Sequence, residues 1–161
     1  MIKIDLTPSE IAMASFVGCQ RAIQNIQDKD TRSRSGEAEH LLFDRMVKGA
    51  LAECALAKHL NKFWSKGVKG GADVDNVDVR CTHYHNGDLE MHTWDKDDRK
   101  YYLLTGMLGS YVLRGWIWGK DAKKQEYWKV KREGRKPQFW VPQSALNDNT
   151  IEPEDKHWLD D

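Results

Sequence analysis

Four side chains of this sequence have the types and the spacing that a divalent-metal site requires. Asp78 and Arg80 stand two residues apart in a segment that is typical of a β-strand, so both side chains leave the same face. Asp73 precedes them across a short polar turn, and Glu53 lies in a helical segment upstream. Three carboxylates and one cation directed at one point predict a metal site with a charge-stabilising partner.

Glu53 is predicted to be buried, because it falls on the apolar stripe of its helix. The small or apolar positions of that stripe are Leu42, Met46, Gly49, Ala50, Ala57 and Leu60. A carboxylate at such a position is unstable unless a cation or a hydrogen-bond donor pairs with it. The alternative that stays open is that Glu53 snorkels or forms a salt bridge, and that Asp78 and Arg80 form a same-face pair on a solvated sheet.

The chemistry of these residues suits phosphodiester hydrolysis. Asp73, Asp78 and the main-chain carbonyl of Val79 are the predicted ligands of Mg²⁺ or Mn²⁺, and Glu53 reaches the ion directly or through water. Cleavage needs an activated water and a stabilised leaving oxygen. Arg80 is the candidate for stabilising negative charge on the phosphate, and it cannot act as a base because a guanidinium stays protonated.

Local signals predict the elements that position these residues. Thr7, Pro8 and Glu10 form a helix start with a capping box, which predicts a first helix over 8–27. A second helix over about 37–63 carries Glu53. The period then changes to two, and the predicted strands cover 74–84, 89–94, 101–105 and 111–118, with a hairpin turn at Asn86-Gly87 and either a bulge or a close backbone approach at Gly115. Short helical segments are expected at 120–128 and 143–146, on either side of an extended segment at 139–141.

This order of elements predicts one α+β (mixed α/β) domain over 1–161, with a helical N-terminal region at about 8–63 and a mainly antiparallel central sheet. The composition, 40% hydrophobic and 31% charged, fits a globular protein. No apolar run is long enough to cross a membrane, no signal peptide is evident, and the three cysteines suit reduced thiols. These features predict a cytoplasmic location without a membrane partner.

Charge is unevenly distributed although the formal net charge is zero. Residues 120–136 contain eight Lys or Arg and three Asp or Glu, a net of +5, whereas the acidic tail at about 148–161 contains one Lys and six Asp or Glu, a net of −5. The basic segment could follow a nucleic-acid backbone or form a solvated loop. The seven tryptophans could stack bases, but a core or a homodimer interface is favoured.

A zinc site is a weaker alternative. Cys81, His83 and His85 alternate along one strand face and His92 lies nearby in sequence, but their spacing matches no common zinc module.

The succession of a helix-borne Glu, an Asp and a strand-borne Asp-x-Arg resembles the PD-(D/E)XK nuclease superfamily. The segment 73–82, Asp-Val-Asp-Asn-Val-Asp-Val-Arg-Cys-Thr, is similar to the compact form in small phage-encoded members. The resemblance extends over roughly 40–146 and includes the segments 97–106, 111–119 and 139–143. It implies a restriction-endonuclease-like fold, in which helices flank a central mixed sheet, and a nuclease that cleaves DNA in the host cytoplasm.

By that resemblance, Glu53, Asp73 and Asp78 match the carboxylates that bind Mg²⁺ or Mn²⁺, and Arg80 matches the catalytic lysine. The sequence also departs from the family pattern. Ala72 replaces the usual proline, Asp78 stands where Glu is common, and Arg80 replaces Lys. Asp75 is a rival of Asp73 for the second ligand position. A catalytically inactive nuclease-fold protein that binds nucleic acid or a host protein is therefore the alternative function.

Overall fold

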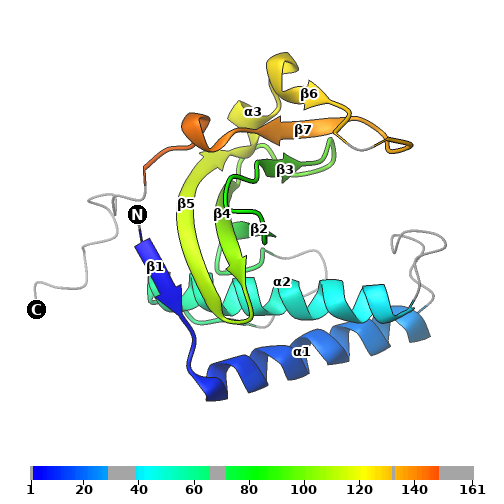
Figure 1. Cartoon of the computed structure of the whole chain (residues 1–161), viewed down its shortest axis with the longest axis vertical. Helices are drawn as coiled ribbons and strands as arrows, with labels where there is room; N and C mark the ends of the chain where they lie inside the picture. The colour runs from blue at the N-terminus through cyan, green and yellow to red at the C-terminus, as the bar shows by residue number, and fades with distance from the viewer. Residues whose placement is uncertain (1, 29–38, 66–71, 132, 149–161) are drawn as a thin grey trace, which may run out of the picture.

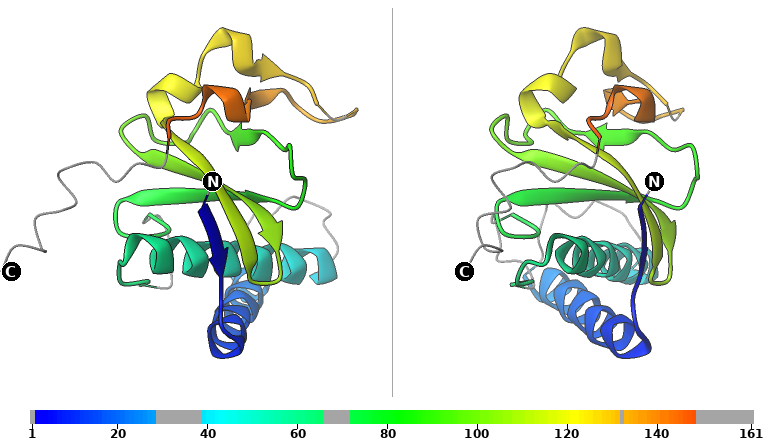
Figure 2. Two further views of the ribbon diagram at one scale, coloured as in Figure 1. Left: turned by 60° about the vertical axis from the view of Figure 1, so that its left-hand side comes forward. Right: turned by 90° about the vertical axis from the view of Figure 1, so that its left-hand side faces the viewer.

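The computed structural model describes residues 2–28, 39–65, 72–131 and 133–148, which form a mixed α+β fold (Figure 1). Two long helices lie on one side of a four-stranded sheet, here called sheet A. A three-stranded sheet, sheet B, lies on the other side (Figure 2). The α+β class predicted from the sequence is confirmed. The acidic tail predicted at 148–161 lies outside the described residues, apart from Asp148.

Helix α1 (Pro8–Gln27) begins at the capping box that the sequence predicts. The Thr7 hydroxyl accepts a hydrogen bond from the Glu10 N–H at 3.3 Å, and the Glu10 carboxylate accepts one from the Thr7 N–H at 2.7 Å. These two bonds satisfy backbone donors that the first turn of a helix would otherwise leave unpaired. The predicted bounds of the first helix are confirmed.

Helix α2 (Glu39–Leu60) packs between α1 and sheet A. Gly18 of α1 approaches the α2 backbone so closely that a Cβ on it would stand 2.5 Å from the Val47 Cα. Every residue over 50–57 is buried, and most of them are small or apolar. Small side chains let the helix lie close to the sheet, and this close packing determines how far Glu53 lies from strand β2.

Sheet A has the strand order β1-β5-β4-β2, with bounds β1 (Ile2–Asp5), β5 (Ser110–Trp118), β4 (Lys100–Met107) and β2 (Val77–Thr82). The pairs β1–β5 and β5–β4 are antiparallel, whereas β4 and β2 are parallel, so the sheet is mixed. The register shifts between Leu103 and Leu104, opposite Gly115, which confirms the predicted bulge. Strand β2 lies at an edge, with Val77 and Val79 in the core that α2 covers.

Sheet B contains β3 (Leu89–Met91), β7 (Gln138–Val141) and β6 (Trp128–Lys129). The hairpin predicted at Asn86-Gly87 is wrong, because β2 and β3 belong to different sheets and β3 pairs with β7 instead. That pairing places Leu89 and Met91, both 0% exposed, in a second core between the two sheets. Burial of these two side chains therefore decides the strand partner, although Asn86-Gly87 still forms a turn.

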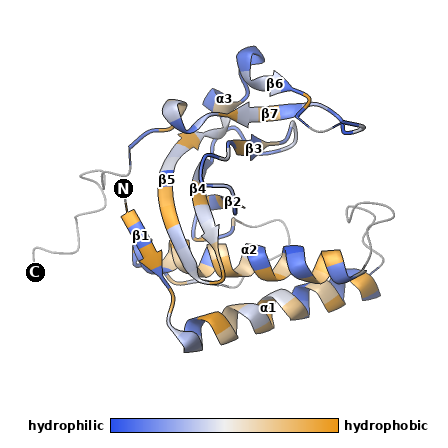
Figure 3. Cartoon of the chain, in the orientation of Figure 1, coloured by the Kyte–Doolittle hydropathy of each residue, from blue (hydrophilic) through white to orange (hydrophobic). Residues whose placement is uncertain are grey.

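Short helical segments complete the structure. The helix predicted over 120–128 is replaced by α3 (Gly119–Ala122) and the 3₁₀ turn η1 (Gln125–Tyr127), while η2 (Gln143–Ala145) confirms the last predicted turn. Figure 3 shows apolar residues on both long helices and on the strands of sheet A, and a hydrophilic loop between β6 and β7. Among the helices that the structure describes, none combines the length and apolar character of a membrane span.

Candidate functional site

Glu53 lies in the middle of α2 and is 6% exposed, as the helix stripe predicts. Its carboxylate accepts hydrogen bonds from both terminal nitrogens of Arg21, each at 2.7 Å, and from the Trp64 indole N–H at 3.1 Å. The two-pronged geometry of the Arg21 contact makes it a strong charge-assisted pair. The buried Glu53 carboxylate therefore has the partner that its position requires, and that partner is Arg21 of α1.

Asp73 and Asp78 are joined by reciprocal contacts with the backbone at the start of β2. The Asp73 N–H donates to Asp78 Oδ1 at 3.0 Å, and the Val79 N–H donates to Asp73 Oδ2 at 2.9 Å. Arg99 Nη1, which comes from the turn before β4, donates to both Asp78 oxygens at 3.1 and 3.0 Å. The strand therefore holds the two carboxylates beside each other, and Arg99 balances one of them.

Arg80 is held by neighbouring groups on the side of β2 that faces sheet B. Its Nε donates to the Glu90 carbonyl at 3.1 Å, and its Nη1 donates to the Val79 carbonyl at 3.3 Å. Its Nη2 forms an ion pair with Asp95 at 2.9 Å, and the guanidinium lies 5.0 Å from the centre of the Tyr101 ring. These contacts fix Arg80 beside the carboxylates and orient it toward Asp95.

The charges of this region balance pairwise except at Asp73. Arg21 pairs with Glu53, Arg99 with Asp78 and Arg80 with Asp95, whereas Asp73 forms no ion pair within the described part of the chain. The pKa of Asp73 is raised to about 7, chiefly by burial and then by the Glu53 and Asp78 charges, against the opposing effects of the Val79 N–H and Arg80. The group here called the acid cluster (Glu53, Asp73 and Asp78) thus contains one carboxylate, Asp73, that forms no ion pair with the described residues.

A hard divalent cation suits the chemistry of the acid cluster, since all its donors are oxygen atoms. In the arrangement that the described residues adopt, however, no three Asp, Glu, His or Cys side chains are placed to share an ion. Guanidinium groups contact both oxygens of Glu53 and of Asp78, and Arg80 contacts the Val79 carbonyl. Joint metal binding by these groups would require some of the arginine contacts to be replaced.

The structure also distinguishes Asp73 from Asp75, the alternative candidate for the second metal-ligand position. Asp75 stands in the turn with a positive φ of 51° and an exposed side chain, 3.8 Å from the Lys62 ammonium. It therefore lies apart from the contacts that link Asp73 to Asp78. The zinc alternative gains no support, since the described Cys81, His83 and His85 side chains are exposed and form no metal-binding group.

Sequence reasoning missed the cations that balance the cluster. Arg21 had a usable signal, because it lies among the buried positions of α1, next to Ala22 and three residues after Gly18. A basic residue there predicts an acidic partner on a packed helix, by the same logic that singled out Glu53. Arg99 and Asp95 had no such signal, because they lie in a charged turn whose orientation depends on the packing of β4.

No protein-family model, no curated protein and no solved structure matches this chain. The residues of the site and their order in the sequence are therefore the features that bear on function.

Proposed function

We propose that this protein is a metal-dependent nuclease that hydrolyses DNA phosphodiester bonds with Mg²⁺ or Mn²⁺. The observation that supports this proposal is the Asp73 carboxylate, which stands next to Asp78 at the start of β2, near the Glu53 charge, and forms no ion pair with the described residues. Excess negative charge held by a rigid strand and a buried helix is the environment that a divalent cation stabilises. The PD-(D/E)XK-like order of these residues supports the same assignment.

In this proposal, Glu53, Asp73, Asp78 and the Val79 carbonyl would hold the cation once it replaced the Arg21 and Arg99 contacts, and the cation would supply Lewis-acid stabilisation of charge on the scissile phosphate. The backbone contacts between Asp73 and Asp78 keep the two carboxylates in position before a substrate arrives. Arg80 contributes a fixed positive charge, and Asp95 limits its movement toward a substrate. The site would act in the cytoplasm, that of the host if a phage encodes the protein.

One observation favours the alternative function, a catalytically inactive nuclease-fold protein that binds nucleic acid or a host protein. Arg21 and Arg99 each contact both oxygens of a carboxylate that a metal ion would use. In an inactive protein, these guanidinium groups would permanently replace the cation. Calorimetric titration with Mn²⁺ separates the two functions, because only the nuclease requires a heat of metal binding that disappears in the Asp73→Asn variant.

Cleavage itself is tested on supercoiled plasmid and on an end-labelled single-stranded oligonucleotide, each with EDTA, Mg²⁺ or Mn²⁺. We expect metal-dependent cleavage by the wild type and none by Asp78→Asn, whose amide oxygen can still accept from the Asp73 N–H; a melting curve checks that the variant folds without the Arg99 ion pair. Asp44→Asn is the matched control, because Asp44 is an exposed carboxylate on α2 that pairs only locally with Lys48. If the wild type cuts neither substrate with either ion, the nuclease proposal is wrong.

A further inference from the structure

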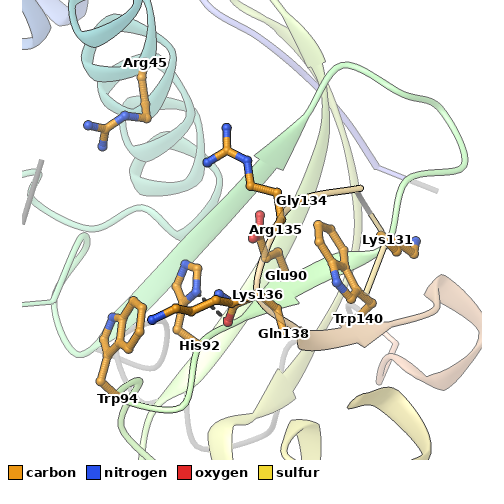
Figure 4. Close-up of a pocket in the computed structure, with 10 residues that line it drawn as sticks. All are labelled: Arg45, Glu90, His92, Trp94, Lys131, Gly134, Arg135, Lys136, Gln138 and Trp140. Atoms are coloured by element: carbon orange, nitrogen blue, oxygen red, sulfur yellow. Dashed lines mark hydrogen bonds between the residues drawn. The ribbon is translucent and has the colours of Figure 1, made fainter. Parts of the chain in front are cut away.

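A pocket of about 540 Å³ is lined by one face of sheet B, by the loop between β6 and β7 and by Arg45 of helix α2 (Figure 4). Strand alternation creates this face, because β3 and β7 turn Leu89, Met91 and Val141 into the second core. The alternate positions, Glu90, Gln138 and Trp140, line the pocket together with His92 and Trp94, which follow β3. The volume is that of a small-molecule site and suits one nucleotide better than a duplex.

The rim of the pocket is strongly basic. Arg45 of α2 and Lys131, Arg135 and Lys136 of the loop between β6 and β7 line it, against the single carboxylate of Glu90. Lys131 is already balanced by an ion pair with Asp88. Within the described ranges, Arg135 and Lys136 form no ion pair, and both are exposed. Their charges are therefore available to an anionic ligand such as a phosphate.

Trp94 gives the pocket a surface on which a flat ring can stack. Its side chain is 74% exposed, and its ring stacks on His92 with centroids 4.5 Å apart and planes inclined by 9°. His92 is fixed in turn by a 2.9 Å hydrogen bond between its Nδ1 and Gln138 Oε1, which Figure 4 marks. An indole held in this way but left open to solvent suits base stacking, which is indifferent to base identity.

Arg80 and Asp95 connect the pocket to strand β2. Arg80 Nε donates to the carbonyl of Glu90, whose side chain lines the pocket, and Arg80 Nη2 pairs with Asp95. The Asp95 carboxylate also accepts a hydrogen bond from the His92 N–H at 2.7 Å. A nucleic-acid strand held in the pocket would consequently pass next to β2, where Asp78 lies.

We propose that this pocket binds an unpaired nucleotide of single-stranded DNA, with its base stacked on Trp94 and a backbone phosphate bound by Arg135 and Lys136. The choice of DNA rests on the proposed nuclease function, whereas the pocket itself is independent of metal. A base inside a duplex has both faces covered by its neighbours, so it cannot stack on Trp94 without leaving the helix. The proposal therefore names an unpaired strand, rather than intact duplex, as the ligand.

The test is fluorescence anisotropy in EDTA with a labelled 12-nucleotide oligothymidine, a 12-base-pair duplex as comparison, and unlabelled dTMP as competitor. We expect the single strand to bind more tightly than the duplex, and Trp94→Ala to weaken it about tenfold or more, since one stacked base is lost. The double variant Arg135→Ala/Lys136→Ala should reduce the slope of log K against log salt by about 0.7, because the contact with one phosphate disappears. Competition by dTMP should need far higher concentrations than competition by unlabelled oligothymidine.

Matched controls come from elsewhere on the surface. Phe16 on α1 is a 63% exposed aromatic residue, and Lys3 and Lys124 are exposed cations outside the pocket, so Phe16→Ala and Lys3→Ala/Lys124→Ala should bind like the wild type. The pocket proposal is overturned if Trp94→Ala binds the strand normally, if the duplex binds as tightly as the strand, or if dTMP competes equally well. Trp94-dependent binding without any metal-dependent cleavage would support the pocket and reject the nuclease function. Metal-dependent cleavage without any Trp94-dependent binding would support the nuclease function and reject the pocket.

Discussion

Replacement of Asp73 by Asn should stabilise the protein at alkaline pH, because it removes a charge that the fold holds unfavourably. The folded-state pKa of Asp73 is raised from 3.8 to about 7, chiefly by burial and then by the Glu53 charge. A carboxyl group with a raised pKa favours the folded state while it is protonated. This stabilisation is complete below about pH 3.8, is lost as the pH rises, and is absent above about pH 7.

The size of the effect follows from the shift. About three pH units at about 1.4 kcal/mol each correspond to about 4 kcal/mol, of which about 3 kcal/mol is lost between pH 5 and pH 8. Domains of this kind have unfolding free energies of about 5–15 kcal/mol, so the change is a large share of the total. In a chain of this length it corresponds to a difference in melting temperature of roughly 10 °C.

The measurement is urea and thermal unfolding of wild type and Asp73→Asn in EDTA at pH 5 and pH 8. The quantity of interest is the stability difference between the two proteins, because groups such as His59, whose pKa burial lowers, cancel from it. We expect the advantage of the variant to grow by about 3 kcal/mol between the two pH values. Asp44→Asn should show no such growth, since Asp44 is an exposed carboxylate.

Mn²⁺ added at pH 8 provides a second comparison. A cation that binds only the folded state raises the melting temperature by mass action. We expect that increase in the wild type and a much smaller one in Asp73→Asn. A stability difference that stays constant from pH 5 to pH 8 would refute the reasoning, because Asp73 would then be as easily ionised in the folded protein as in the unfolded chain.

Substitutions at two further positions test the contacts that support the site. Gly18→Ala should lower the unfolding free energy by several kcal/mol in urea denaturation, since its Cβ would stand 2.5 Å from the Val47 Cα and force α1 away from α2. Arg80→Ala should cost about 3–5 kcal/mol because it leaves the largely buried Asp95 carboxylate unpaired, whereas Arg80→Lys should cost less because it keeps a cation there. Equal melting temperatures for the two Arg80 variants would show that the ion pair is not structural.

The sequence predicts those features that depend on local pattern. The capping box at Thr7 and Glu10 marks the start of α1, and the apolar stripe of α2 correctly places Glu53 in the interior. The two-residue period places Asp78 and Arg80 on one face of β2. Each of these inferences uses residues within a few positions of one another, where backbone geometry determines the relation between side chains.

The features that escaped prediction depend on contacts between distant segments. Arg21 meets Glu53 across 32 positions, and Arg99 meets Asp78 across 21, so their pairing follows from helix and strand packing. The partner of β3 is likewise decided by the core between the sheets, although Asn86-Gly87 is a good local hairpin signal. Local pattern thus identifies the carboxylates, and tertiary packing determines which cation balances each of them.

The pairing of β1 with β5 has a consequence for the order in which the chain is made. Ile2 lies opposite Leu113, so the ribosome synthesises one strand long before the other. At about 5–20 residues per second, roughly 110 residues require about 6–22 s. Throughout that interval, Ile2 and Ile4 have no sheet to join, and an unpaired apolar strand is a template for pairing with other chains. During translation, β1 therefore stays unpaired until β5 has been made, and in this interval its apolar side chains are open to pairing with other chains.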